Sequence, residues 1–264
     1  MELCAHTVHV WSVDLDHWSP ESFGGVLSAD EQARASRFKF EQLRDRFIIC
    51  RGLLRYCLSQ YLAVEPVQVH FTYGAKGKPA LQSSAGLAFN LSHSQNRAVY
   101  AFSQENIGVD LEQISDSTPY LELAARFFLP QEYQQLVALP APQQQRAFFQ
   151  TWTRKEACIK LRGTSLGEDL SRIQVPVIFT DPAQQSQQIA YGLDLALWED
   201  CAAAIALSAP WHRVQCWQWC PSVPKTEILV PTQCRQEFEL HPEDFWSGWL
   251  TTAYNVGNDK KSRQ

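Results

Sequence analysis

The sequence predicts an α+β protein made of two similar halves, because one pattern of strands and helices occurs twice along the chain. The first half opens with a strand of alternating apolar and polar residues at Val8–Leu15. The pattern begins again with a strand at Ile107–Glu112. Each half also carries one long helix, Glu41–Leu62 in the first and Gln143–Leu161 in the second. Ligand sites often lie between two packed halves of this kind.

The first half continues with a helix that Ser28 begins, and Glu31 stands three residues on as the second member of a capping box. The long helix that follows has apolar residues at helical spacing, so we expect one buried stripe along it. The stripe consists of Leu43, Phe47, Leu54, Leu58 and Tyr61. The remaining strands of this half are expected at Val67–Tyr73, Leu87–Leu91 and Arg97–Ser103.

In the second half, two helices at Tyr120–Phe128 and Gln131–Leu139 precede the long helix, which Gly163 ends. Four further strands are expected at Ile173–Phe179, Ile189–Trp198, Cys201–Ser208 and Arg213–Trp219. We therefore divide the chain into a first half, 1–105, a second half, 106–220, and a C-terminal extension, 221–264. The pattern indicates no role for the extension.

The composition of the chain argues against several classes of protein. The chain has 264 residues, 45% of them hydrophobic, which suffices for one large core or two smaller ones. A net charge of −5 argues against a nucleic-acid-binding protein, although it leaves room for a local basic pocket. The first residues do not resemble a signal peptide, and no apolar run reaches the ~20 residues of a membrane helix. We expect a cytoplasmic protein with no membrane or nucleic-acid partner.

The 8 cysteines are scattered, and only Cys216 and Cys220 stand close together. A single C-x₃-C pair is a weak signal for zinc. We therefore expect reduced cysteines that serve as small hydrophobic residues.

Two acidic residues mark a candidate metal site. Asp110 and Glu112 are two apart on the predicted strand Ile107–Glu112, so both carboxylates lie on one face. Neighbouring carboxylates repel each other unless a cation or proton lies between them, and hard oxygen ligands suit Mg²⁺. Taken alone, the pair is better explained as a solvated strand end.

A third carboxylate comes from the second long helix. Glu156 and Lys160 are one turn apart and share a face. A plain salt bridge is the simpler interpretation of this pair. The functional interpretation gives Mg²⁺ a third ligand and gives a phosphate group a lysine.

A third group of candidate residues is basic and lies in the first half. Three arginines line one side of the helix Glu41–Leu62: Arg44, Arg51 and Arg55. Lys76 and Lys78 flank Gly77 in a predicted turn, and His93 follows a predicted strand. These residues form either a solvated basic face or a site for a polyanion, because arginine matches the geometry of phosphate oxygens.

The order of these motifs resembles the 4′-phosphopantetheinyl transferases of the Sfp type. The motifs are G-K-P at Gly77–Pro79, N-L-S-H-S at Asn90–Ser94, I-G-V-D-L-E at Ile107–Glu112, R-F-F-L-P-Q-E-Y at Arg126–Tyr133, W-T-R-K-E-A-C-I-K at Trp152–Lys160 and R-x-R-F-x-x-x-R-x-x-L-R at Arg44–Arg55. The resemblance spans roughly residues 28–210. It implies a pseudo-dimer of two α+β halves with coenzyme A bound in the cleft between them.

The resemblance also implies roles for individual residues. It places Mg²⁺ on Asp110, Glu112 and Glu156, and the nucleotide with its phosphates on Arg51, Lys78, Ser92 and His93. It places Lys160 at the pyrophosphate and offers Glu132 as a general base. Arg34 is a further candidate for binding coenzyme A, whereas Glu31 stands where some relatives have a lysine.

The implied reaction transfers the phosphopantetheine arm of coenzyme A to a serine of an apo acyl, peptidyl or polyketide carrier protein. The resemblance further implies a monomer. We expect the carrier to dock on apolar residues near the helix after the D-x-E strand, around Tyr120–Phe128. Two alternatives stay open: a non-catalytic protein that binds coenzyme A, and a Mg²⁺-dependent phosphatase or nucleotidyl transferase.

Overall fold

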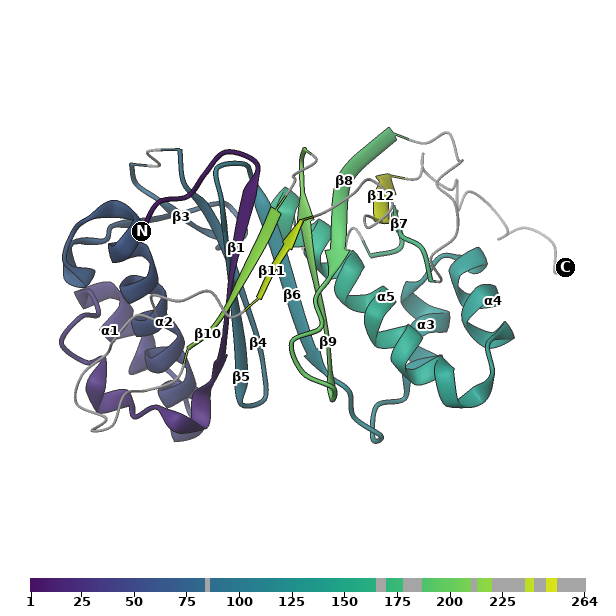
Figure 1. Cartoon of the computed structure of the whole chain (residues 1–264). Coiled ribbons are helices and arrows are strands. Elements are labelled where there is room, and N and C mark those ends of the chain that lie inside the picture. Colours follow the sequence, from purple (N-terminus) through teal and green to yellow (C-terminus); the bar gives the residue numbers. More distant parts are fainter. Residues whose placement is uncertain are drawn as a thin grey trace, which may run out of the picture.

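The protein consists of two five-stranded sheets packed face to face, with helices on both outer sides (Figure 1). The computed structural model describes residues 1–83, 86–164, 170–177, 187–209, 213–219, 236–239 and 246–250. The helices are α1 (Ala29–Ala35), α2 (Glu41–Leu62), α3 (Tyr120–Phe127), α4 (Pro130–Ala138) and α5 (Ala141–Arg162). None of the described helices is long and apolar enough to cross a membrane.

The first sheet has the strand order β11-β10-β1-β5-β4. Its strands are β1 (Thr7–Asp14), β4 (Ala88–Ser94), β5 (Arg97–Ser103), β10 (Arg213–Trp219) and β11 (Gln236–Glu239). The second sheet has the order β6-β9-β8-β12-β7. Its strands are β6 (Ile107–Gln113), β7 (Ile173–Gln174), β8 (Gln187–Asp194), β9 (Cys201–Leu207) and β12 (Trp246–Leu250). A short hairpin, β2 (Phe71–Tyr73) and β3 (Pro79–Leu81), stands apart from both sheets.

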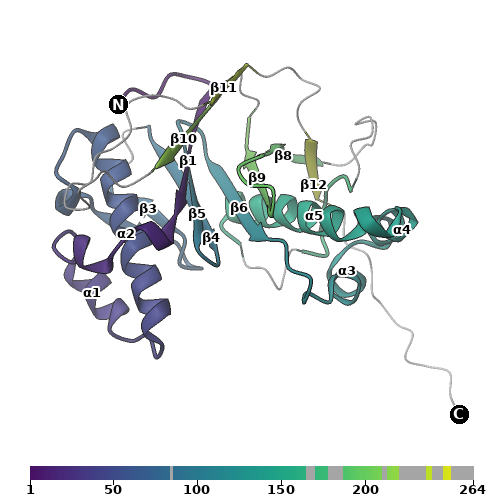
Figure 2. The same ribbon diagram turned by 60° about the horizontal axis from the view of Figure 1, so that its bottom comes forward.

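The layers follow the order helix, sheet, sheet, helix, with α2 and α5 on opposite outer sides (Figure 2). One core cluster fills the space between α2 and the first sheet, and another joins the two sheets, for example Val10 and Val99 of the first with Val109 and Ile205 of the second. Two further clusters lie between the second sheet and helices α3 to α5. The expected α+β architecture of two halves is confirmed.

The chain crosses back into the first half near its end. β10, which the sequence assigned to the second half, pairs with β1 in parallel, with Val8 opposite Val214. The C-terminal extension then adds β11 beside β10 and β12 beside β8 and β7. The division at 106–220 and 221–264 therefore does not follow the sheets. The period-two pattern of β10 identifies a strand but does not specify its partner.

Several element boundaries differ from the sequence prediction. The strand predicted at Val67–Tyr73 is confined to its last residues, because Pro66 begins a 3₁₀ turn, Pro66–Gln68, which suits the fixed φ of proline. Leu43 is wrongly placed in the buried stripe, since it is 52% exposed near the start of α2. β7 covers only the first two residues of Ile173–Phe179, whose end lies outside the described residues.

Six cysteines lie among the described residues, and five of these six are buried, as expected for small hydrophobic residues. The buried ones are Cys50, Cys57, Cys158, Cys201 and Cys216, and Cys4 is exposed. Cys220 and Cys234 lie outside the described residues.

The second half depends on a close approach between α5 and β6 at Gly108. A Cβ atom at this glycine would lie 2.0 Å from the carbonyl oxygen of Ala157 and 2.4 Å from the amide nitrogen of Leu161. Both are backbone atoms of α5, so a rotamer change cannot relieve the clash. Ala204 and Ala206 of β9 belong to the same buried cluster as residues of α5. Their small side chains let the helix lie close to this strand as well. Small residues thus let α5 lie directly on the strand that carries Asp110 and Glu112.

We predict that Gly108→Ala destabilises the protein by about 2–3 kcal/mol or more, because the added methyl forces α5 away from β6. The measurement is urea unfolding followed by circular dichroism. Gly25→Ala is the matched control, because nothing lies within 4 Å of a Cβ atom there, and we expect it to stay within about 0.5 kcal/mol of wild type. Equal midpoints for Gly108→Ala and wild type would contradict the close approach.

Candidate active site

Strand β4 separates two groups of functional residues because its side chains alternate between two faces. Leu91 and His93 line a pocket under α2. Ser92 and Ser94 instead face β6, where the Ser92 hydroxyl donates to Asp110 Oδ1 and the Ser94 hydroxyl donates to Glu112 Oε2, each at 2.9 Å. The N-L-S-H-S motif therefore contributes side chains to a pocket on one face of β4 and to an acidic cluster on the other.

The same strand also binds the backbone of β6. The Val109 N–H donates to Asn90 Oδ1 at 2.9 Å, and the Gln113 N–H donates to Ser94 Oγ at 3.1 Å. Side chains of β4 thus accept hydrogen bonds from the β6 backbone, in place of the backbone carbonyls that would accept them within one sheet. This polar ladder connects the edges of the two sheets and fixes where β6 presents its carboxylates.

Asp110 is the centre of the acidic cluster. Its carboxylate is buried, and Oδ1 accepts from Ser92 and from the Lys160 ammonium, which lies 2.6 Å away. Asp110 Oδ2 is buried without a hydrogen-bond partner. A buried carboxylate oxygen left without a partner carries a free-energy cost of about 1–3 kcal/mol or more. Asp110 is therefore poised to accept a further donor or a cation.

Glu156 and Glu112 share the charge environment of Asp110. Burial raises the pKa of Glu156 to about 8, and the charges of Asp110 and Glu112 add to the increase. Burial and the charge of Asp110 also raise the pKa of Glu112, which the Ser94 hydroxyl partly offsets. The sequence-predicted carboxylates from β6 and α5 therefore interact strongly, as expected of groups that share a cation or a proton.

The cluster suits a divalent cation by its chemistry. Among the described residues, no three His, Cys, Asp or Glu side chains are arranged closely enough to hold a metal ion by themselves. Mg²⁺ commonly takes one or two carboxylates and completes its shell with water and phosphate oxygens, so it does not require such a group. The unpartnered Asp110 Oδ2 and the raised pKa values of Glu112 and Glu156 fit this mode of binding.

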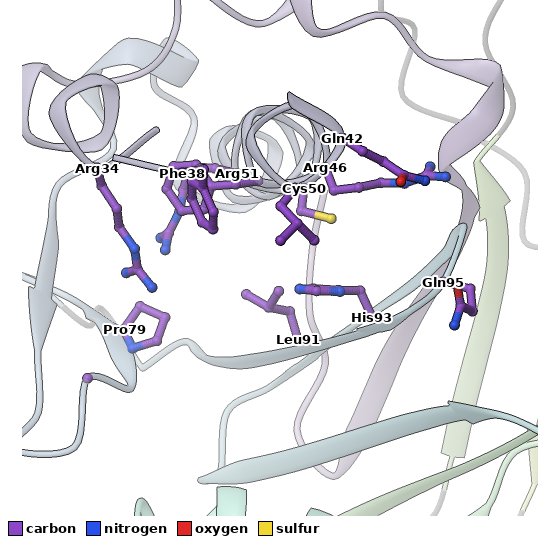
Figure 3. A pocket seen from close by; sticks show the side chains of 13 residues that line it. Arg34, Phe38, Gln42, Arg46, Cys50, Arg51, Pro79, Leu91, His93 and Gln95 are labelled. Carbon is purple, nitrogen blue, oxygen red and sulfur yellow. The ribbon is translucent and has the colours of Figure 1, made fainter. Parts of the chain in front are cut away.

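The pocket on the other side of β4 has a volume of about 520 Å³ and a basic lining. Figure 3 shows Arg34 and Pro79 at one end, Arg46 and Gln95 at the other, and His93 between them. Its apolar wall consists of Phe38, Leu43, Phe47, Cys50, Pro79 and Leu91. The combination of arginines and apolar surface suits an anionic ligand that also carries an aromatic ring.

Arg51 is the most constrained cation of the pocket. Its Nε lies 3.5 Å from Oε1 of the buried Glu31, and its guanidinium carbon lies 4.9 Å from the ring centroid of Phe71. The nitrogen Nη1 of Arg51 is buried without a hydrogen-bond partner. Glu31 thus holds Arg51 in place. Arg51 is ready to donate to a ligand.

The other two arginines of the predicted basic side have structural roles. Arg55 is buried, donates to Glu31 Oε2 at 2.8 Å and binds the carbonyl oxygens of Pro66 and Val69. Arg44 is partly exposed and pairs with neighbouring acids on the surface of α2. The sequence prediction overlooked Arg46, although it lies inside the quoted R-x-R-F motif.

His93 connects the pocket with the acidic cluster electrostatically. Desolvation by the pocket walls lowers the pKa of His93, and the positive charges of Lys160 and Arg46 lower it further. The ring is therefore neutral at neutral pH in this state. An anion bound beside it would restore part of the affinity for a proton.

Comparison with known proteins assigns the family. Residues 10–105 match the model of the 4′-phosphopantetheinyl transferase N-terminal domain, and residues 106–206 match that of the 4′-phosphopantetheinyl transferase superfamily. The chain is 41% identical over 228 residues to the 4′-phosphopantetheinyl transferase HetI of Nostoc sp., a match that covers 83% of this chain and 95% of HetI. The chain belongs to the 4′-phosphopantetheinyl transferase family.

Other relatives in this family are more distant. Psf-1 of Bacillus pumilus is 35% identical, covering 57% of this chain and 64% of the relative. Sfp of Bacillus subtilis is 29% identical, covering 59% of this chain and 68% of the relative. Both relatives are named 4′-phosphopantetheinyl transferases.

Two residues that the family resemblance assigned to the nucleotide and its phosphates point away from the pocket in this transferase. The Lys78 ammonium lies against the carboxyl end of α5, although its neighbours Gly77 and Pro79 line the pocket. Burial there lowers the pKa of Lys78 to about 8. Ser92 faces Asp110 and Lys160 rather than the pocket, with its hydroxyl oxygen 2.8 Å from the Lys160 ammonium.

Glu132 is also placed away from the pocket lining. Its carboxylate is buried, pairs with the Lys155 ammonium at 2.7 Å and accepts from the N–H groups of Leu129 and Val175 at 2.8 and 2.9 Å. These donors satisfy both carboxylate oxygens. The arrangement is that of a structural ion pair which ties α4 and α5 together, and it speaks against a general base.

We predict that Glu156→Gln stabilises the metal-free protein at pH 8 but not at pH 5. Folded Glu156 keeps its proton up to about pH 8, whereas an unfolded glutamate loses it near 4.5. The folded state therefore binds more protons between these values, so wild-type stability falls as the pH rises through them. Each kcal/mol by which Glu156→Gln stabilises the folded state corresponds to a Tm increase of about 2–4 °C.

The measurement is thermal unfolding in EDTA at pH 5, 6.5 and 8, with Glu105→Gln at an exposed position as control. A Tm difference between Glu156→Gln and wild type that does not change with pH would contradict the assigned pKa.

Proposed function

We propose that this chain binds coenzyme A in the basic pocket and transfers its 4′-phosphopantetheine group at the neighbouring acidic cluster, with Mg²⁺ as cofactor. As a 4′-phosphopantetheinyl transferase, the chain converts an apo carrier protein to its holo form and releases adenosine 3′,5′-bisphosphate. The observation that carries the assignment of the site is the alternation along β4, which gives His93 to the pocket and Ser92 to Asp110.

In this proposal, the pocket holds the nucleotide. Arg34, Arg46, Arg51 and His93 line it and would donate to phosphate oxygens, since arginine forms charge-assisted bonds to phosphate. The unpartnered Nη1 of Arg51 supports this role most directly. The apolar wall accommodates the adenine ring. A strongly anionic substrate explains why an acidic protein builds a basic pocket.

The transfer itself is a displacement at the β-phosphorus of coenzyme A. The carrier serine oxygen forms a new bond to phosphorus, the pyrophosphate P–O bond breaks, and the electron pair leaves with adenosine 3′,5′-bisphosphate. Asp110, Glu112 and Glu156 would supply carboxylate ligands for Mg²⁺, which would neutralise the pyrophosphate charge as a Lewis acid. Lys160 would then exchange its bond with Asp110 for one with a phosphate oxygen.

The serine proton needs an acceptor. The Glu132 carboxylate already accepts from three donors, so it is not free to act as the general base. We assign the proton to a carboxylate oxygen of Glu156, because this side chain belongs to the cluster beside which the phosphorus would lie. Ser92 orients both Asp110 and Lys160 in this arrangement.

No observation favours the alternative of a non-catalytic protein that binds coenzyme A. The acidic residues, Lys160 and the basic pocket all occur together, and the family models match both halves. We further propose that the enzyme acts as a cytoplasmic monomer without a nucleic-acid or membrane partner, which size-exclusion chromatography with light scattering and cell fractionation would test.

We predict that Asp110→Asn lowers the rate of transfer at least about 100-fold while the fold is retained, because one ligand of the cation loses its charge. The experiment incubates apo acyl carrier protein, and separately an apo peptidyl carrier domain, with coenzyme A and Mg²⁺, and follows the intact mass of the carrier. Wild type should add one phosphopantetheine group to at least one carrier.

The matched control is Asp116→Asn at an exposed position, which should transfer at the wild-type rate. A rate of transfer by Asp110→Asn within about threefold of the wild-type rate would contradict the metal assignment. Tight coenzyme A binding by wild type without any gain in carrier mass would instead favour the non-catalytic alternative.

We predict that Glu132→Gln lowers the free energy of unfolding by about 3–5 kcal/mol, because it leaves Lys155 buried without its counter-ion. The folded enzyme should keep most of its kcat. Denaturant unfolding and initial rates at low temperature measure the two effects separately. A variant of unchanged stability whose kcat falls at least 100-fold would restore Glu132 as the general base.

A further inference from the structure

The Lys78 ammonium occupies the carboxyl end of α5. Its Nζ lies 2.6 Å from the carbonyl oxygen of Lys160, 3.2 Å from that of Ile107 and 3.4 Å from that of Leu161. The last carbonyls of a helix have no partner within the helix and carry partial negative charge. An ammonium group with three donors matches this end in both hydrogen bonding and charge.

Asn106 completes the same cap. Its Nδ2 donates to the Leu161 carbonyl at 2.7 Å, and its Oδ1 lies 3.4 Å from the Lys78 ammonium. Gly163 then ends α5 in the left-handed conformation, with φ of 68°. The end of α5 is therefore held by one side chain from the β2–β3 hairpin and one from the loop before β6.

The position of Lys78 connects the two parts of the site. Its neighbours Gly77 and Pro79 line the pocket, whereas its ammonium holds the helical turn that carries Lys160. One turn earlier, the same helix carries Glu156, and the Lys160 side chain reaches Asp110. A short chain of contacts thus leads from the pocket wall, through Lys78 and the backbone of α5, to the acidic cluster.

We propose that Lys78 is a positioning residue that sets the end of α5, and with it Lys160 and Glu156, relative to the coenzyme A pocket, and that it is not a ligand of the phosphates. This inference rests on the proposed function of the site. For Lys78 to turn into the pocket, it would have to leave several acceptors around the end of α5. A displacement of about 1 Å between a catalytic group and its substrate can cost 100-fold in rate.

The test uses Lys78→Met, which keeps the aliphatic stem and removes the donors. We expect kcat to fall about tenfold or more while KM for coenzyme A stays within about threefold of wild type. The ratio of KM for 3′-dephospho-coenzyme A to KM for coenzyme A should also stay as in wild type. Amide hydrogen exchange in Leu161–Gly163 should become faster, whereas exchange in α2 should not change.

Three further variants sharpen the comparison. Asn106→Ala removes the other side chain of the cap without touching the pocket, so it should lower kcat in the same direction with KM unchanged. Lys76→Met removes a positive charge two residues away and serves as a comparison for the loss of a neighbouring lysine. Lys78→Arg keeps donors for the helix end and should recover part of kcat.

An increase in KM for coenzyme A with kcat retained would overturn the inference. So would a loss of the preference for coenzyme A over 3′-dephospho-coenzyme A, or kinetics and exchange in Lys78→Met identical to wild type. A Tm decrease with kcat of the folded enzyme unchanged would also overturn it, because a purely structural cap predicts that result. If wild type transfers nothing to any carrier, the proposed function fails, and the exchange measurement still tests the cap.

Discussion

The contact of α5 with β6 at Gly108 is the constraint on which the active site depends. Asp110 and Glu112 lie on a strand and Glu156 on a helix, so they interact only if these two elements lie almost backbone to backbone. That approach brings these acids together and raises the pKa values of Glu112 and Glu156, which costs free energy in the metal-free protein. The fold thus places mutually repelling acids where a bound cation would relieve the repulsion.

Strand β4 joins this cluster to the rest of the molecule. It is the edge strand of the first sheet, and its polar side chains bind the edge strand of the second. The alternate side chains of the same strand form the wall of the pocket under α2. A strand needs no special geometry for this division, because a period of two already places neighbours on opposite faces. One short motif therefore organises both the binding and the reacting part of the site.

Much of this arrangement was predictable from the sequence, because the signals are local. The capping box at Ser28, the helix α2, the end of α5 at Gly163 and the common face of Asp110 and Glu112 follow from spacing within a few residues. The partner of β10, the burial of Arg55 and Glu132, and the position of the Lys78 ammonium depend on contacts between distant segments. Residue type marks these side chains as charged but does not indicate whether a charge faces substrate or a buried partner.

Phosphorus NMR of coenzyme A bound to the chain tests the central claim most directly, with small amounts of Mn²⁺ as a paramagnetic probe. The claim is that the pocket under α2 delivers the pyrophosphate to a cation held by the cluster around Asp110. We expect Mn²⁺ to broaden the pyrophosphate resonances of bound coenzyme A more than that of the 3′-phosphate, and to lose this preference in Asp110→Asn. Equal broadening of the pyrophosphate resonances in wild type and Asp110→Asn would contradict the account.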